Sequence, residues 1–334
     1  MKFFKKLLKN KIFYGVIFFI VVFLLVWFWP QEKLKPDYGV TFSAKYAREL
    51  GLNPKETLQA IFIDLGVKKV RLVAYWDDIQ DADGHLNYQD LDWQIAMAEK
   101  YQAEVILAVG KRVPRWPECH IPTWALQLDK EKQDEALLKF VRETVVRYKD
   151  KNVVKVWQIE NEPFLGSYAK QYCGQLDKNI LDKEIALVKE NDFNTPVLIT
   201  DSGELSLWNA AYSRGDQFGS TFYVYVANQV FDDVRSVMSH NSYRYKLDLM
   251  SLFHGKKPSY LIEISIEPWL TKPIIQTSFA EQLKKMNISR AKTILDIASQ
   301  TGFTEQYLWG AEWWYYLKLN GYPELWDYIK NIKK

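Results

Sequence analysis

The 334-residue sequence has little of what several common protein classes need. It has only two cysteines, which excludes a metal site built from clustered thiolates. None of its four histidines lies at a spacing typical of metal ligands, and no G-x-S-x-G nucleophile motif is present. A glycine-rich G-x-G-x-x-G loop is also missing, so nothing indicates a dinucleotide site. We therefore expect chemistry that requires neither a metal nor a cofactor.

The charge is unevenly distributed along the chain. The formal net charge is +3, but residues 1–36 carry seven Lys and one Glu, which leaves −3 for the remainder. A mildly acidic body argues against a nucleic-acid partner, which would favour a basic face. The hydrophobic share of 48% and the charged share of 25% are typical of a globular protein.

The N-terminal region predicts a membrane anchor. A cluster of lysines within residues 1–11 precedes an unbroken apolar run from Ile12 to Trp29. About 20 apolar residues cross a bilayer core, and the basic side stays in the cytoplasm. We expect a basic cytoplasmic segment at 1–11, a transmembrane signal-anchor at 12–29, a tether at 30–37 and an extracytoplasmic domain at 38–334. A cleaved signal peptide is the alternative, but the run ends in Trp-Phe-Trp-Pro without small residues.

The rest of the chain alternates between strand-like apolar runs and amphipathic helices. One helix is expected to begin at Asn53-Pro54, and the others are Asp90–Tyr101, Lys130–Lys149, Lys178–Asn191, Ser278–Thr301 and Pro323–Ile332. Most of the runs lack polar alternation, as expected for parallel strands buried on both faces. Eight such units predict an α/β fold, a (β/α)₈ TIM barrel preceded by the single N-terminal helix. An open doubly wound sheet is the rival, and it would favour a glycine-rich loop after the first strand. The expected strands are Gly39–Ser43, Lys69–Ala74, Ala103–Val109, Val154–Glu160, Pro196–Asp201, Ser220–Val226, Ser259–Ile264 and Tyr307–Trp313.

Carboxylates, amides and aromatic residues dominate the predicted carboxyl ends of these strands, where barrels hold their active sites. Paired carboxylates are suited to glycoside cleavage, because one acid protonates the leaving group and the other attacks or stabilises the sugar carbon. Aromatic faces suit the C–H faces of sugar rings, although many of the Trp residues should pack in the core. The residues at the strand ends thus favour a glycosidase.

The segment Trp157–Phe164, with the sequence WQIENEPF, resembles the fourth strand of glycoside hydrolase clan A. This clan contains retaining (β/α)₈ glycosidases such as cellulases, mannanases and family 42 β-galactosidases. Lys257–Glu263 resembles the seventh strand of the same clan. The resemblance implies that Glu162 is the catalytic acid/base and that Glu263 is the nucleophile. Their separation of 101 residues over three βα units agrees with a barrel, at about 34 residues per unit.

The resemblance implies further substrate-binding roles. Arg71 would hold the nucleophile region, Asn161 would contact the sugar 2-hydroxyl and Tyr223 would bond the nucleophile. The strand-eight Trp that floors the sugar site would be Trp313 or Trp314. Trp76, at the end of strand two, is a further candidate for substrate binding.

Strand seven departs from the clan pattern, because it continues as Glu-Ile-Ser-Ile-Glu-Pro-Trp rather than Glu-Phe-Gly or Glu-Trp-Gly. Glu263 and Glu267 have the same parity, so either could face the barrel mouth. We favour Glu263 as the nucleophile, which leaves Glu267 as a sugar-hydroxyl acceptor.

The two cysteines, Cys119 and Cys173, follow predicted strands three and four. An exported domain can form disulfides, so these residues are a possible pair on the active-site face, and two buried free thiols are the alternative.

Taken with the N-terminal segment, these features predict a membrane-anchored retaining glycoside hydrolase acting on an oligo- or polysaccharide with a β-linkage. A carbohydrate-binding barrel with weak or no turnover, or a transglycosylase of the same clan, stays open. The strand-end motifs do not identify the sugar, its linkage or the acceptor.

Overall fold

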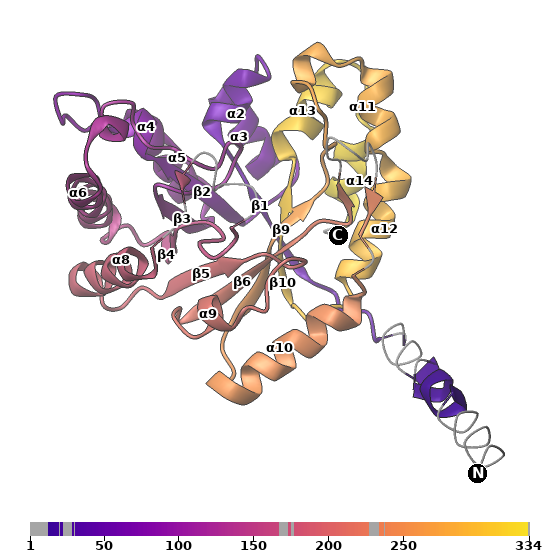
Figure 1. Ribbon diagram of the computed structural model, residues 1–334. Helices are drawn as coiled ribbons and strands as arrows, with labels where there is room; N and C mark the ends of the chain where they lie inside the picture. Colours follow the sequence, from indigo (N-terminus) through magenta and orange to yellow (C-terminus); the bar gives the residue numbers. More distant parts are fainter. Residues whose placement is uncertain are drawn as a thin grey trace, which may run out of the picture.

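The computed structural model describes residues 13–19, 21–22, 29, 31–166, 173–174, 177–226, 234–236 and 238–332. Its centre is a closed barrel of eight parallel strands surrounded by helices (Figure 1). The predicted TIM barrel is therefore confirmed. The barrel strands are β1 Asp37–Thr41, β2 Lys69–Tyr75, β3 Glu104–Gly110, β4 Val154–Ile159, β5 Val197–Asp201, β6 Gln217–Phe222, β9 Ser259–Ser265 and β10 Glu305–Trp309.

The strands follow the ring in chain order, and β1 closes it by pairing with β10. A short antiparallel hairpin of β7 (Tyr225–Val226) and β8 (Val234–Arg235) follows β6 and lies outside the ring. The carboxyl ends of all eight strands consequently meet at one mouth.

Helices cover the outer face of the ring, and several begin where the sequence predicts. Asn53 caps α3 by accepting from the backbone N–H of Lys55, and Pro54 occupies its first turn. The predicted helix at 278–301 is instead two helices, because Asn287 begins and caps a new one. The helices are α2 Ala44–Glu49, α3 Pro54–Ile63, α4 Trp76–Ile79, α5 Gln89–Tyr101, α6 Lys130–Tyr148, α8 Lys178–Asn191, α9 Asn209–Tyr212, α10 His240–His254, α11 Phe279–Lys285, α12 Ile288–Ala298, α13 Ala311–Leu319 and α14 Glu324–Ile332, with 3₁₀ turns at Ala125–Gln127 and Ile274–Gln276.

Two strands end earlier than predicted. Strand six is Gln217–Phe222 rather than 220–226, so Tyr223 lies just past its end. Strand eight is Glu305–Trp309 rather than 307–313, because Gly310 leaves the extended conformation with φ +120° and caps α13. The expected position of Trp313 and Trp314 on strand eight is therefore wrong, since both lie in α13.

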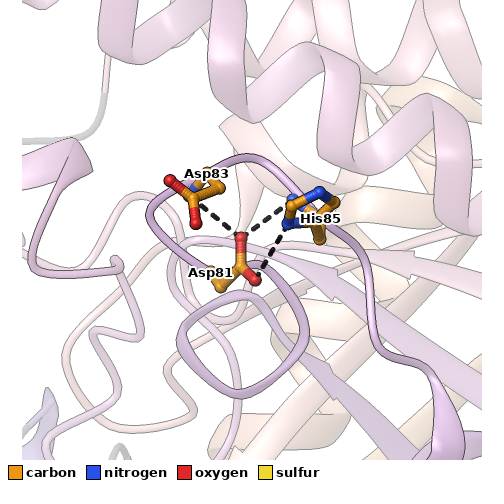
Figure 2. Close-up of side chains that lie close together, drawn as sticks. All are labelled: Asp81, Asp83 and His85. Atoms are coloured by element: carbon orange, nitrogen blue, oxygen red, sulfur yellow. Dashed lines mark hydrogen bonds and ion pairs between the residues drawn. The ribbon is translucent and has the colours of Figure 1, made fainter.

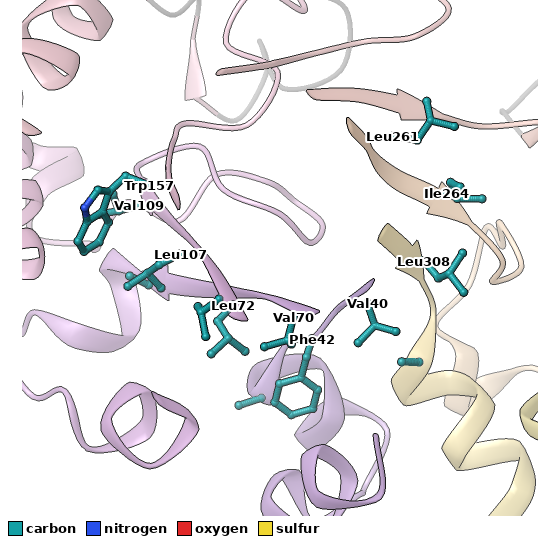
Figure 3. Packing of buried hydrophobic residues seen from close by; sticks show 14 of the residues in the cluster. Val40, Phe42, Val70, Leu72, Leu107, Val109, Trp157, Leu261, Ile264 and Leu308 are labelled. Atoms are coloured by element: carbon teal, nitrogen blue, oxygen red, sulfur yellow. The ribbon is translucent and has the colours of Figure 1, made fainter. Parts of the chain in front are cut away.

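The core has an outer and an inner part. Outward-facing strand residues such as Val40, Leu72 and Leu308 pack against the helices (Figure 3). Inside the ring lies a smaller apolar layer that includes Ile106 and Ile262. This layer fills the barrel below the mouth, as in other (β/α)₈ barrels.

Strand β9 contains a bulge that affects the site directly. Ser220 of β6 lies opposite Leu261 of β9, and the next residue, Thr221, lies opposite Glu263. Ile262 is therefore an extra residue on β9, with no partner on β6. Ile262 joins the inner apolar layer, and the next residue, Glu263, also points inward and contacts Arg71. A bulge that re-aims a side chain is common beside active sites.

Residues 12, 20 and 23–28 of the predicted membrane segment 12–29 lie outside the described residues. Of this segment, residues 13–19 and 21–22 are helical. Among the described residues, no helix is both long and apolar enough to cross a membrane. The predicted tether contacts the barrel, because Lys33 pairs with Asp296 and the Leu34 N–H donates to the carbonyl of Ser299.

Candidate active site

Glu162 stands just beyond the end of β4, with its side chain buried at the barrel mouth. Its backbone N–H donates to the hydroxyl of Thr200 on β5 at 2.9 Å. The hydroxyl of Thr221 on β6 donates to its Oε1 at 2.8 Å. Two neighbouring strands therefore fix both the backbone and the carboxyl group of Glu162.

Glu263, on β9, is fully buried and held by two donors. Arg71 of β2 donates Nη1–H to Oε1 at 2.6 Å, and the hydroxyl of Tyr223 donates to Oε2 at 2.7 Å. An ion pair with a fully buried guanidinium stabilises the carboxylate in this low-dielectric setting. Because Thr221 pairs with Glu263 and also bonds Glu162, the two carboxyls share one part of the mouth.

Asn161 completes the polar network between these groups. Its Oδ1 accepts from Nη2 of Arg71 at 2.7 Å and from the Gln158 amide at 3.2 Å. No described residue accepts a hydrogen bond from its buried Nδ2. A buried donor without a partner is costly, so Nδ2 is available to a ligand hydroxyl at this point.

Burial is the main factor that raises the pKa of Glu162 well above its ordinary value. The neighbouring carboxylates of Glu118 and Glu263 add to the rise, since each disfavours a second negative charge. The protonated form of Glu162 therefore persists to higher pH than that of an ordinary glutamic acid. One neutral carboxyl beside one ion-paired carboxylate is the arrangement that acid-assisted displacement requires.

Glu118 is a third carboxyl group close to Glu162 and Glu263, and the sequence motifs do not identify it. Burial raises its pKa, and the charge of Glu263 contributes next. Arg112 lies 3.4 Å from the Glu118 carboxylate, and its Nη1 donates to the carbonyl of Leu165, in the loop that carries Glu162. Arg112 thus connects the loop after β3 to the loop after β4.

The disulfide between Cys119 and Cys173 joins the same two loops, 54 residues apart in sequence. Within the loop after β3, an isolated antiparallel β-bridge pairs the backbone of Arg112 with that of Cys119. The Trp116–Pro117 peptide bond in this loop is cis. The Glu118 N–H donates to the carbonyl of Arg115 at 2.6 Å. These contacts together position Glu118 at the mouth.

Glu267 belongs to a second cluster at the mouth. Arg115 donates to its Oε1 at 2.6 Å and to Glu312 at 2.9 Å, and its guanidinium stacks between the rings of Tyr46 and Trp309. The indole N–H of Trp309 also donates to Oε1 of Glu267. No described residue donates to the buried Oε2, so this oxygen can accept from a ligand hydroxyl.

Three tryptophans expected to bind substrate are instead buried in the core. Trp76 stacks on Phe140 of α6 and is fully buried. Trp313 and Trp314 are also fully buried, and Trp314 donates to the carbonyl of Ile266. Their rings pack inside the protein, so this structure leaves none of the three exposed at the mouth. The tryptophan of strand eight that lies at the mouth is Trp309. Gly310, which follows it directly, is the sequence feature that marks the end of this strand.

The backbone at the mouth is unusually strained. Six non-glycine residues in the described ranges have positive φ, and five of them lie in loops after β3, β4 and β5. Glu162 itself has φ +44°. Such conformations cost of order 1–3 kcal/mol each and concentrate at functional sites.

Gly110 permits another close contact near this strained loop. Its φ is +145°, and a Cβ there would stand 2.6 Å from the carboxyl carbon of Glu160. Glu160 accepts from the backbone N–H groups of Lys111 and Arg112. Glu160 therefore anchors the loop after β3.

In the described ranges, one group of acidic and histidine side chains has a spacing that could hold an ion, namely Asp81, Asp83 and His85 (Figure 2). All three are exposed. Asp81 accepts from the backbone N–H groups of the other two, and lies 3.3 Å from the His85 ring nitrogen. Its oxygens close their own turn, which accounts for the cluster without an ion.

No protein-family model matches the sequence, and no curated protein matches it either. Solved structures do match in fold. Xylanase 10B from Thermotoga petrophila RKU-1, in complex with xylobiose, is 16% identical, with a TM-score of 0.53 over 82% of each chain. The endo-β-1,4-mannanase from Thermotoga petrophila is 14% identical, with a TM-score of 0.57 over 83% of this chain and 68% of that one.

A family 1 β-glucosidase from Thermotoga maritima is 12% identical, with a TM-score of 0.51 over 84% of this chain and 89% of that one. These proteins are clan A (β/α)₈ barrels. The resemblance predicted from the sequence is therefore confirmed at the level of the fold.

Proposed function

We propose that this chain is a retaining glycosidase that cleaves a β-linked glycan. The observation that carries the proposal is the pair of Glu162 and Glu263, with the first favoured as the neutral acid and the second ion-paired to Arg71. The xylanase, mannanase and β-glucosidase names of proteins with this fold support a β-linked carbohydrate substrate.

The mechanism follows from these two carboxyls. Glu263 attacks the anomeric carbon while Glu162 protonates the departing glycosidic oxygen, which breaks the glycosidic bond and forms a glycosyl ester on Glu263. Glu162, now ionised, takes a proton from water, and that water displaces Glu263. The sugar leaves with its original anomeric configuration, and both carboxyls return to their starting states. Asn161 Nδ2 and Glu267 Oε2 would bind sugar hydroxyls.

The test uses the full-length protein with aryl β-glycosides and β-glycans. Glu162→Gln should lose about 100-fold or more in kcat/KM on substrates with poor leaving groups. The loss in kcat/KM should be much smaller on dinitrophenyl glycosides, because kcat/KM reports the first step and their leaving group needs no proton. Glu263→Gln should lose activity on both kinds. Glu143→Gln, on the exposed face of α6, is the control. Full activity in either site variant would refute the assignment.

Product analysis separates the alternatives within this proposal. NMR of the first product should show retained configuration. Transfer to an added sugar in preference to water would indicate a transglycosylase. Saturable sugar binding without turnover by the unmodified protein would indicate a binding barrel.

We also propose that residues 12–29 anchor the chain in a membrane, with the barrel outside the cytoplasm. The support is the apolar run and the lysines that precede it. Vesicle flotation of the full-length chain tests the anchoring, and protease protection of the barrel in sealed spheroplasts or inverted vesicles tests its side.

A further inference from the structure

Helix α10 exposes an apolar stripe to solvent. Tyr245, Leu249, Leu252 and Phe253 are 39%, 46%, 78% and 66% exposed. Their spacing of four, three and one residues places them on one face of the helix. Single exposed apolar residues are ordinary on protein surfaces, whereas an aligned set indicates an interaction surface.

The loop after β5 extends this stripe. Leu205 and Leu207 are 59% and 80% exposed. Both line a hollow of about 400 Å³, together with Tyr245 and Leu249 from α10. The α10 face, defined as these four residues with Leu252 and Phe253, is therefore one continuous surface from two elements.

The N-terminal segment reaches the barrel at the beginning of α10. The carbonyl of Trp29 accepts from Nδ2 of Asn241 at 2.7 Å and lies 3.0 Å from Nε2 of His240. In Figure 1 the indigo helical segment of residues 13–19 lies outside the barrel, to the lower right of α10. Trp29 is the last residue of the apolar run, so the end of the proposed anchor is fixed against α10.

We propose that the α10 face docks on the lipid surface of the membrane that holds residues 12–29. This inference rests on the proposed anchoring. A helix with one apolar face can lie in the interface with that face buried about 5–10 Å below the headgroups. The anchor keeps α10 beside the bilayer at high effective concentration, so a contact that would be weak for a free protein suffices. The position of Trp29 favours lipid over a second protein as the occupant.

The experiment places a fluorescent label on the face of the full-length chain. Cys119 and Cys173 are joined, so an introduced thiol can be labelled selectively. Leu252→Cys carries an environment-sensitive nitrobenzoxadiazole group in phosphatidylcholine vesicles, with or without nitroxide-bearing phosphatidylcholine. Leu126→Cys is the matched control, because Leu126 is 55% exposed in the 3₁₀ turn after β3, four strands around the ring from β9.

The result expected is several-fold stronger nitroxide quenching at residue 252 than at residue 126, with a blue-shifted emission at 252. Equal quenching at both sites, in protein that floats with the vesicles, would overturn the docking inference and leave anchoring intact. A blue shift at 252 without lipid quenching would also overturn it, since protein would then cover the face. Failure to float would refute the anchoring, and the docking inference with it. Glycosidase activity is measured separately and is independent of these outcomes.

Discussion

Glu118 shares the barrel mouth with Glu162 and Glu263, and its charge affects the proton affinity of Glu162. Burial and the charge of Glu263 raise the pKa of Glu118, and the charge of Glu118 in turn contributes to the raised pKa of Glu162. A negative charge on Glu118 then opposes the loss of the proton from Glu162. Glu118 would in this way widen the pH range in which the acid is ready to act.

Replacing Glu118 by Gln should therefore lower the pKa of Glu162. A general acid works when protonated, so kcat/KM falls as the pH rises through its pKa. The falling limb of the kcat/KM profile should move to lower pH in Glu118→Gln. The exposed Glu143→Gln variant should leave the profile unchanged. An unmoved limb in Glu118→Gln, with folding intact, would show that this charge does not act on Glu162.

At the level of single residues, sequence motifs pointed to Glu162 and Glu263, because each lies at the carboxyl end of a strand with a recognisable pattern. Glu118 was not identified as part of the centre, since its position depends on a loop folded by Arg112 and the disulfide. The sequence prediction named Trp313 or Trp314 for strand eight, whereas the strand ends at Trp309. Gly310 marked that end, but an aromatic run on both sides of it concealed the boundary.

Helix α8 carries a buried carboxyl in an unfavourable place. Glu184 is fully buried, and burial followed by the charge of Glu160 raises its pKa well above the ordinary value. In its protonated form Glu184 also donates a hydrogen bond to the carboxylate of Glu160, which further favours the proton on Glu184. The folded state therefore binds the Glu184 proton more tightly than the unfolded state does.

Linkage gives the direction of the effect on stability. The folded protein loses stability as the pH rises from about 4.5, the ordinary value, toward the raised pKa. Glu184→Gln is neutral at every pH and avoids this loss. Its melting temperature should exceed that of the parent by about 2 °C or more at neutral pH, and by little near pH 4.

Thermal unfolding at several pH values measures this difference. Glu190→Gln is the matched control, because Glu190 is exposed on the same helix. A melting temperature that falls in Glu184→Gln at neutral pH would mean that the charged form of Glu184 stabilises the fold.

Apolar patterns and caps predicted α3, α6 and α8 closely, since these helices have clear starts. They did not predict the β9 bulge, which adds one residue to a strand without changing its composition. Helix α10 was also missed, because its exposed apolar stripe obscures the usual contrast between a buried and a polar face.

For the molecule as a whole, the disulfide connects two loops of the mouth and no strand of the ring. Closing 54 residues by a cross-link stabilises a protein by at most about 4 kcal/mol in the chain-entropy model. We expect the Cys119→Ser/Cys173→Ser double variant to keep the barrel, because the strand pairs do not involve these residues.

The double variant should nevertheless lose kcat/KM well below its melting temperature, since Glu118 adjoins Cys119. Circular dichroism checks the fold, and steady-state kinetics measure the loss. Reduction of the unmodified protein should reproduce the loss. Unchanged kinetics in both cases would show that Arg112 alone suffices to hold the loop.

The pairing of β1 with β10 has a consequence for how the protein is made. Asp37 lies opposite Glu305, so the seam of the ring joins the first barrel strand to the barrel strand that is synthesised last. Until then, the nascent sheet has two open edges, which are templates for pairing with other chains. The ring cannot close until β10 has been synthesised, and a chain that stops before residue 305 would keep both edges exposed.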